Sequence, residues 1–303
     1  MTVPEPGRRT PAVVPARPGP RVGWKPDAPT VPAPGSTPPP RPILDLAGVT
    51  LRVGGLTCLA DVSLRQRRGT VLAVVGPNGA GKTALLDCLT GSRRPSRGSA
   101  HFWPARGPGG PVELFGRSAP AVARLGIART FRETRLFDQL TVLDNVRVGV
   151  EAAARGGTRR ALVPGTPGRG GIRAARSAAR ELLDLVGLAD RAAEPAAGLP
   201  RGARRRLEVA SALGTRPSLL LLDEPAAGVP AAERAWLAEL VGQVQARGVS
   251  VLLAEHDPRL ALAVADTVVV LEAGAVVATG TPAEVVGSLA ALGAYRAPSP
   301  AGT

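Results

Sequence analysis

The clearest chemical pattern in the chain is the run Gly76-Pro77-Asn78-Gly79-Ala80-Gly81-Lys82-Thr83. Glycines let successive backbone N–H groups turn inward around a polyphosphate, while a lysine at this spacing reaches the β- and γ-phosphates. A threonine hydroxyl after the lysine is a ligand type that Mg²⁺ accepts. The run therefore predicts a phosphate-binding loop whose residues all contact a nucleotide.

The sequence on either side of this loop supports the prediction. The preceding residues 70–75 read Thr-Val-Leu-Ala-Val-Val, which is typical of a buried strand. A helix is expected to start near Lys82, and its N-terminus would point the positive end of its dipole at the same anion. Many unrelated chains match the loop pattern alone, so the strand and helix context carries much of the argument.

Two adjacent carboxylates form a second candidate group. Four leucines at 219–222 predict a buried parallel strand, and Asp223 and Glu224 follow it directly. At the carboxyl end of a strand beside a phosphate loop, Asp223 can hold Mg²⁺ through water, and Glu224 can orient or deprotonate an attacking water. The alternative is an ordinary acidic boundary between a strand and a turn.

His256 follows another apolar run, 249–254, and is one of two histidines in the chain. At the same sheet edge as the two acids it could hydrogen-bond a γ-phosphate, although a lone histidine is more often structural. His101 lies between turn-rich segments, and a structural role is expected for it.

The elements that must position these groups alternate between strands and helices. Residues 155–172 are rich in Arg, Gly and Pro and predict a surface loop. Strands are expected at 43–46, 49–53 and 60–64, and helices at 84–90, from Thr141 onward, at 174–186, at 207–213 and at 230–247. The helices between 174 and 213 suggest a helical subdomain inserted in an α/β core. The last helix carries Leu237, Leu240, Val241 and Val244 on one stripe.

The composition separates a core-forming middle from its ends. Residues 1–42 contain 14 prolines and few apolar side chains, which predicts a disordered tail. No apolar run in the chain exceeds strand length, so neither a signal peptide nor a membrane span is predicted. We expect a cytosolic protein unless a partner holds it at a membrane.

The formal net charge of +14 raises the possibility of nucleic-acid binding. The basic residues are spread along the chain, and aromatic residues make up only 3% of it, which leaves no stacking platform for bases. Nucleic acid is therefore not an expected partner. Only two lysines occur, Lys25 and Lys82, so the one in the phosphate loop stands out. Cys58 and Cys88 are too few for a disulfide framework or a metal site, and we expect them to pack as small apolar residues.

Taken in order, these segments resemble the nucleotide-binding subunit of an ATP-binding cassette (ABC) transporter, from about Ile43 to Val286. The closest likeness is to LivG-type ATP-binding proteins of branched-chain amino acid importers. It implies an α/β P-loop NTPase with a RecA-like core, an antiparallel β subdomain and a helical subdomain at roughly 133–212. The cassette would span 43–286, between tails at 1–42 and 287–303. The segments responsible are 126–131, 135–137, 141–146, 186–191 and 199–208, with the long insertion between Val150 and Ala174.

The resemblance also implies roles for the candidate residues. Residues 76–83 would be the Walker A loop, Asp223 the Walker B magnesium residue, Glu224 the catalytic base and His256 the switch histidine. A signature segment would contact ATP bound on an opposing cassette, and it comprises Leu199, Pro200, Arg201, Gly202 and Ala203. ATP and Mg²⁺ are the implied ligands.

The implied partners are a second ATPase chain, membrane permease subunits docked on the helical subdomain and, indirectly, a periplasmic or lipid-anchored substrate-binding protein. The cassette would then lie peripherally on the cytoplasmic side of the membrane.

Several positions depart from the family pattern. Arg132 stands where the family has the glutamine of the Q-loop, and a guanidinium has no acceptor to replace the amide oxygen. It could contact the γ-phosphate, or it could impair turnover. Ala203 replaces a polar signature residue, Pro230 a polar D-loop residue, and Val53 an aromatic that stacks on adenine. The run 204–206, Arg-Arg-Arg, is expected to be a solvated helix face.

Three functions follow from these observations. The first is an active ATPase subunit of an importer for branched-chain or related amino acids. The second is a cassette that binds ATP but hydrolyses it poorly beside a competent partner chain, with Arg132, Ala203 and Pro230 as its support. The third is a soluble cassette protein without a transporter. The sequence leaves open the transported substrate and whether the dimer is homomeric or heteromeric.

Overall fold

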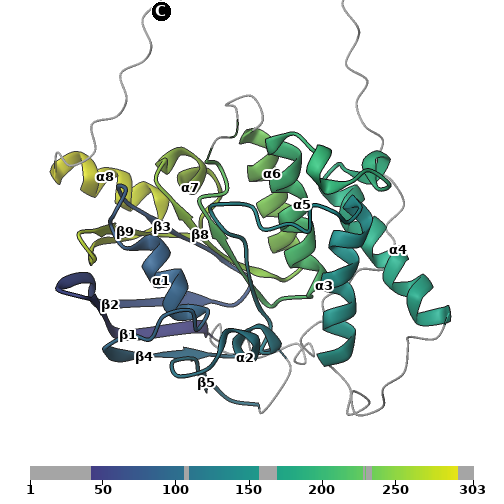
Figure 1. Cartoon of the computed structure of the whole chain (residues 1–303). Coiled ribbons are helices and arrows are strands. Elements are labelled where there is room, and N and C mark those ends of the chain that lie inside the picture. The colour runs from purple at the N-terminus through teal and green to yellow at the C-terminus, as the bar shows by residue number, and fades with distance from the viewer. Residues whose placement is uncertain (1–41, 106–108, 157–168, 228, 230–233, 293–303) are drawn as a thin grey trace, which may run out of the picture.

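The computed structural model describes residues 42–105, 109–156, 169–227, 229 and 234–292 (Figure 1). The predictions made for the proline-rich tail and for Pro230 lie outside these residues. A four-stranded antiparallel sheet and a six-stranded, mostly parallel sheet form the framework. The predicted α/β fold class is confirmed.

The larger sheet has the strand order β10-β9-β3-β8-β7-β6. Strand β10 runs antiparallel to β9, and the other pairings are parallel. The carboxyl ends of β3, β8 and β7, which are neighbours, therefore meet at one edge. The strands are β3 (Val71–Val75), β6 (Ile127–Arg129), β7 (Leu219–Asp223), β8 (Ser250–Glu255), β9 (Thr267–Glu272) and β10 (Ala275–Gly280).

Both faces of the strands β3, β7 and β8 are buried, which explains their uninterrupted apolar runs. Successive residues of β3 point to opposite faces, so Val71 and Ala73 belong to one core cluster and Leu72 and Val74 to the other. The same alternation holds along β7, β8 and β9.

The smaller sheet has the order β2-β1-β4-β5. The two strands predicted at 43–46 and 49–53 are one strand, because the chain passes Gly48 as a bulge with φ +62° and then resumes pairing. His101 lies on this sheet 3.7 Å from Glu113, in the structural setting expected for it. The strands are β1 (Pro42–Val53), β2 (Leu56–Arg67), β4 (Arg97–Phe102) and β5 (Val112–Glu113).

The helices complete a layered molecule. Helix α1 (Lys82–Leu89) lies between the two sheets and buries Leu85, Leu86 and Leu89 against both (Figure 1). The opposite face of the parallel sheet is covered by α6 (Arg234–Ala246), α7 (Pro258–Val264) and α8 (Pro282–Leu292). Helix α2 (Ala119–Arg124) packs beside β6. The four residues predicted to form the buried stripe of α6 are all buried.

Three further helices pack together at one side of the sheet: α3 (Val142–Gly156), α4 (Arg169–Leu185) and α5 (Arg201–Gly214) (Figure 1). The expected cap of α3 is present, since the Thr141 Oγ1 accepts a hydrogen bond of 3.1 Å from the Asp144 N–H. Helix α4 begins five residues earlier than 174, so the segment predicted as loop at 155–172 is partly helical. Among the described helices, none is long and apolar enough to cross a membrane.

Candidate active site at the carboxyl edge of the parallel sheet

The predicted phosphate loop joins β3 to α1, as expected. Two of its glycines have no room for a side chain. A Cβ on Gly76 would lie 2.1 Å from the Leu271 carbonyl oxygen, and one on Gly81, where φ is +105°, would lie 2.6 Å from the Cys58 carbonyl oxygen. These positions require glycine because neighbouring backbone closes around the loop.

Lys82 occupies the centre of the loop. Its Nζ donates hydrogen bonds to the carbonyl oxygens of Gly76 (2.8 Å) and Pro77 (3.0 Å), and it lies 3.8 Å from the Glu224 carboxylate. Burial lowers the pKa of Lys82 below its usual range, and the neighbouring Glu224 carboxylate opposes that shift. The ammonium group is thus held by two backbone carbonyl oxygens at the start of the loop.

The two acids at the end of β7 both contact groups predicted to belong to the site. The Thr83 Oγ1 donates to the Asp223 Oδ1 at 3.2 Å, so a hydroxyl and a carboxylate, both ligand types for Mg²⁺, are already together. Glu224 sits at φ +45°, which is uncommon for a residue with a Cβ. Such backbone conformations concentrate at functional sites.

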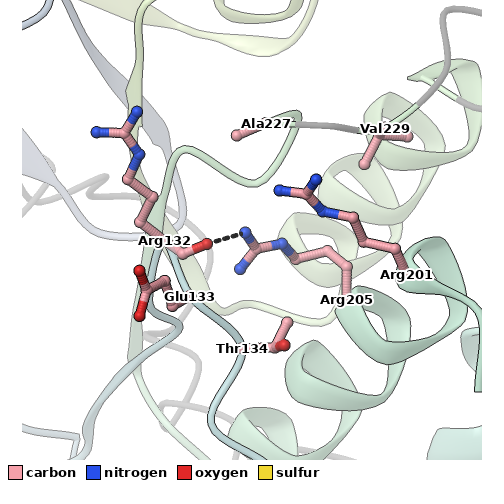
Figure 2. A pocket seen from close by; sticks show the side chains of 7 residues that line it. All are labelled: Arg132, Glu133, Thr134, Arg201, Arg205, Ala227 and Val229. Atoms are coloured by element: carbon pink, nitrogen blue, oxygen red, sulfur yellow. Dashed lines mark hydrogen bonds between the residues drawn. The ribbon is translucent and has the colours of Figure 1, made fainter.

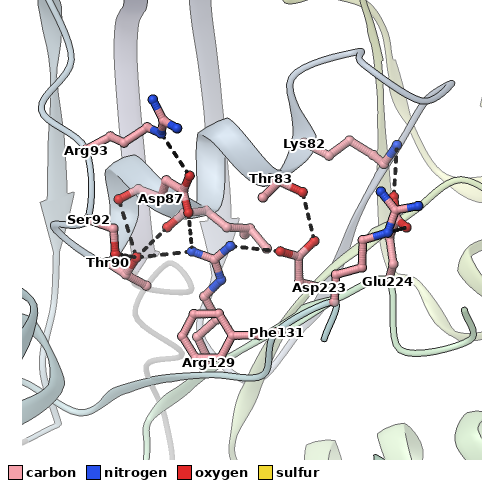
Figure 3. A network of polar contacts seen from close by, with 12 residues as sticks. Lys82, Thr83, Asp87, Thr90, Ser92, Arg93, Arg129, Phe131, Asp223 and Glu224 are labelled. Carbon is pink, nitrogen blue, oxygen red and sulfur yellow. Dashed lines mark hydrogen bonds and ion pairs between the residues drawn. The ribbon is translucent and has the colours of Figure 1, made fainter. Parts of the chain in front are cut away.

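Arg132, at the predicted Q-loop position, pairs with Glu224. Its Nε lies 3.1 Å from the Glu224 Oε2, and the Arg132 side chain is 60% exposed while that of Glu224 is 5% exposed. Glu224 therefore has two cationic neighbours: Lys82 from the phosphate loop (Figure 3) and Arg132 from the segment after β6.

A buried ion network that the sequence did not predict lies beside Asp223. Arg129, the last residue of β6, donates to Asp223 at 2.8 Å and to Asp87 of α1 at 2.7 Å (Figure 3). The only sequence signal was an arginine that ends an otherwise apolar strand. Nothing in its spacing identifies the acids that it reaches, because they lie 42 and 94 residues away.

His256 and Glu255 extend the same edge from β8. The His256 Nδ1 lies 3.6 Å from the Glu255 Oε2, and the histidine side chain is 45% exposed. Glu255 is fully buried and accepts hydrogen bonds from the N–H groups of Ala226 (2.9 Å) and His256 (3.2 Å). Burial raises the pKa of Glu255 against these hydrogen bonds. Glu255, which the sequence did not single out, thereby ties the loop after β7 to the end of β8.

The predicted signature segment begins α5, with Pro200 as its N-cap residue. Arg201 lines a pocket of about 230 Å³ together with Arg132, and Figure 2 shows Arg201 and Arg205 reaching from α5 toward the segment that carries Arg132. Within one chain the signature segment is therefore next to the Q-loop position. The remaining residues that line the pocket are Glu133, Thr134, Arg205, Ala227 and Val229.

The prediction of a solvated arginine face at 204–206 is wrong. Arg205 is 4% exposed and donates to the carbonyl oxygens of Phe131 and Arg132, the latter at 2.7 Å. It also pairs with Glu208 at 2.8 Å, and the other Glu208 oxygen accepts the Phe131 N–H at 2.9 Å. The buried pair therefore holds the backbone from which Arg132 projects.

The other two arginines of this run also contact other side chains. Arg204 donates to Asp138 at 2.7 Å, and the Arg206 guanidinium lies 4.6 Å from the centre of the Trp236 ring. A run of like charges predicts a solvated face only when no acceptors lie nearby, and tertiary packing supplies acceptors here.

A glycine-rich loop around a lysine, facing two adjacent acids at the end of a parallel strand of the same sheet, defines a P-loop nucleotide-binding protein. The family model described as ABC transporter matches residues 59–227, and the chain belongs to this family, as one of its ATP-binding cassettes, a class of ATPase.

Curated relatives cover most of the chain. It is 35% identical to the high-affinity branched-chain amino acid transport ATP-binding protein LivG of Salmonella typhimurium over 246 residues, which cover 81% of this chain and 94% of that protein. It is 36% identical to BraF of Pseudomonas aeruginosa and 33% identical to LivG of Escherichia coli K12, with the same coverage, and both bear the same description.

Solved structures agree on the fold. The ADP conformation of MJ1267, an ATP-binding cassette of an ABC transporter, superposes with a TM-score of 0.68 at 23% identity over 83% of this chain and 95% of that chain. A dimeric post-hydrolysis state of the cassette MJ0796, bound to ADP and Pi, gives 0.65 at 20% identity over 79% of this chain and 98% of that chain.

Proposed function

We propose that the chain binds and hydrolyses MgATP and thereby energises uptake of branched-chain or related amino acids through a separate membrane permease. The observation that carries the ATPase part is the meeting of Lys82, Thr83, Asp223 and Glu224 at one sheet edge. The names of the relatives support the substrate class.

In this proposal the loop from Gly76 to Thr83 wraps the phosphates, and Lys82 moves from its carbonyl acceptors to the β- and γ-phosphate oxygens. Thr83 and Asp223 would hold Mg²⁺, which would neutralise charge on the phosphates. The described residues contain no cluster of three or more acidic, histidine or cysteine side chains that could hold a metal. A site of this kind suits Mg²⁺, which keeps several waters and shares its coordination with substrate phosphates.

Glu224 is proposed as the general base. It would take a proton from the attacking water as the water oxygen bonds to the γ-phosphorus and the bond to the β-phosphate oxygen breaks, which releases ADP and phosphate. His256 would hydrogen-bond the γ-phosphate. Its side chain is 45% exposed beside the buried Glu255, so a nucleotide could reach the ring from solvent.

The signature residues 199–203 are proposed to complete the site of a second cassette, so that ATP is held between two chains. ATP would favour the closed dimer because it binds that state more tightly. Permease subunits would dock on the helical subdomain at roughly 133–212, within a cassette spanning 43–286. The protein would then lie on the cytoplasmic face of the membrane, and a substrate-binding protein would act on the permease's far side.

Equilibrium ATP binding to the full chain tests the first step of this proposal. We expect Mg²⁺-dependent binding that Lys82→Ala weakens at least about tenfold, since the variant removes a direct phosphate contact. Glu224→Gln should retain binding, because the change removes a base and keeps the shape. Wild-type protein that does not bind ATP would contradict the proposal.

A further inference from the structure

Arg129 has no part in the proposed nucleotide binding or hydrolysis, although it contacts Asp223, the proposed magnesium ligand. Its side chain is 4% exposed, and the guanidinium bridges two elements (Figure 3). One terminal nitrogen donates to the Asp223 Oδ2 at 2.8 Å, and the other donates to the Asp87 Oδ1 at 2.7 Å and to the Thr90 Oγ1 at 3.3 Å.

These contacts fix the rotation of the Asp223 carboxylate. Arg129 engages one carboxylate oxygen, so the other, Oδ1, faces the Thr83 hydroxyl at 3.2 Å. A guanidinium is planar and presents its donors in a fixed fork, and its second terminal nitrogen is anchored to α1 through Asp87. Asp223 therefore cannot turn without breaking a buried, charge-assisted hydrogen bond.

We infer that Arg129 is a positioning residue for the metal: it selects the Asp223 oxygen that is presented beside Thr83. The inference rests on the proposed function, because it gives Asp223 and Thr83 the role of magnesium ligands. Hydrogen-bond partners of a ligating carboxylate orient it, and their loss costs roughly 10–100-fold in metal affinity or activity. Arg129 acts through Asp223 and does not contact the nucleotide.

A purely structural role of Arg129 would lead to a different experimental result. If Arg129 only neutralises two acids between α1 and β7, its replacement lowers stability and weakens nucleotide binding equally with and without metal. A positioning role weakens only the part of binding that depends on Mg²⁺.

The matched variants are Arg129→Lys, which keeps the charge but loses the fork, and Arg93→Gln. Arg93 also pairs with Asp87, at 3.2 Å, but its side chain is 48% exposed, and among the ion pairs of the described residues it has none with Asp223. It therefore controls for the loss of an arginine that contacts Asp87.

The experiment is ADP binding to the full chain by calorimetry, across a series of free Mg²⁺ concentrations and in EDTA. We expect Arg129→Lys to raise the Mg²⁺ concentration at half-maximal enhancement by roughly 10–100-fold and to leave the affinity in EDTA unchanged. Arg93→Gln should match wild type in both. A wild-type Mg²⁺ dependence in Arg129→Lys, or equal losses with and without Mg²⁺, would overturn the inference.

If Arg129→Lys does not fold, the same binding experiment can be carried out with Asp87→Asn. It loosens the anchor of the guanidinium without changing Asp223, and we expect a smaller shift of the Mg²⁺ dependence in the same direction. An unchanged dependence in that variant would overturn the inference. If the proposed function itself were wrong, the wild-type protein would show no Mg²⁺-dependent ADP binding, and this result is distinct from a change seen only in the variants.

Discussion

At the scale of single residues, Arg132 has the most direct bearing on catalysis. The Arg132 guanidinium pairs with the carboxylate of Glu224, the proposed general base. The Arg132 side chain is 60% exposed, however, so solvent screens this interaction. Exposed pairs contribute about 0.2–1 kcal/mol, which corresponds to at most roughly fivefold in a rate. On this scale the ion pair alone would modify hydrolysis without abolishing it.

We therefore expect Arg132→Gln to raise kcat for MgATP hydrolysis by roughly two- to fivefold, because Glu224 loses a competing cation and an amide oxygen becomes available. Steady-state kinetics of the purified chain measures this. Arg132→Lys, which keeps the charge, should not raise kcat. An unchanged or lower rate in Arg132→Gln would refute the assignment of an inhibitory contact.

Cys88 gives a second prediction at this scale. It is 1% exposed, and burial raises the pKa of its thiol to about 12. The folded chain thus keeps a proton that the unfolded chain releases above about pH 8.5. The stability due to this group is complete below that pH and is lost as pH rises toward the folded pKa, by up to about 1.4 kcal/mol per pH unit.

Urea unfolding from about pH 8 to about pH 11 tests this sign, with Cys88→Ala as the comparison. The free energy of unfolding of the wild type should fall more steeply with pH than that of the variant, which has no thiol at this position. Parallel pH profiles would show that Cys88 does not titrate in the unfolding transition.

At the scale of elements, the apolar runs and turn residues predicted strands β1, β2, β3, β7 and β8 and helices α1, α3, α4, α5 and α6, whereas β4, β5, β6, β9, β10, α2, α7 and α8 were not predicted. The strand β7, buried on both faces, begins with four consecutive leucines at 219–222. The phosphate loop, with the strand before it and the helix after it, could also be predicted from local sequence alone. What local sequence cannot show is which distant groups meet. The burial of Arg205 depends on carbonyl oxygens more than 70 residues away, and Arg129 reaches acids 42 and 94 residues away.

The crossing of α3 and α5 provides an element-scale prediction. A Cβ on Gly149 would lie 2.4 Å from the Ser211 carbonyl oxygen, so Gly149→Ala should force the helices apart and cost about 1–3 kcal/mol. Gly242 in α6 has open space around its Cβ position, so Gly242→Ala should stabilise by about 0.4–1 kcal/mol. Thermal unfolding of both variants measures the difference. Equal effects would show that the helices do not approach closely at Gly149.

At the scale of the whole molecule, the residues of the candidate site come from segments between Gly76 and His256. The parallel sheet brings these segments together at the carboxyl ends of its strands. The order in which β3, β8 and β7 pair explains why residues from three distant segments meet. Sequence order alone does not give this pairing, although the family resemblance implied it. The first 41 residues contribute none of the proposed site residues.

Deletion of residues 1–40 should therefore leave the affinity for MgADP unchanged, since β1 starts at Pro42 and every proposed ligand lies beyond it. Calorimetric titration of the shortened chain beside the full chain measures this. A large loss of affinity would show that the proline-rich segment takes part in nucleotide binding.

The most direct test of the central claim is steady-state MgATP hydrolysis by the full chain over a series of protein concentrations. We predict a specific activity that rises with protein concentration, as a site shared by two chains requires, and that falls roughly 10²-fold or more in both Lys82→Ala and Glu224→Gln. Hydrolysis that persists in Glu224→Gln, or wild-type protein that binds ATP without turning it over, would contradict the account.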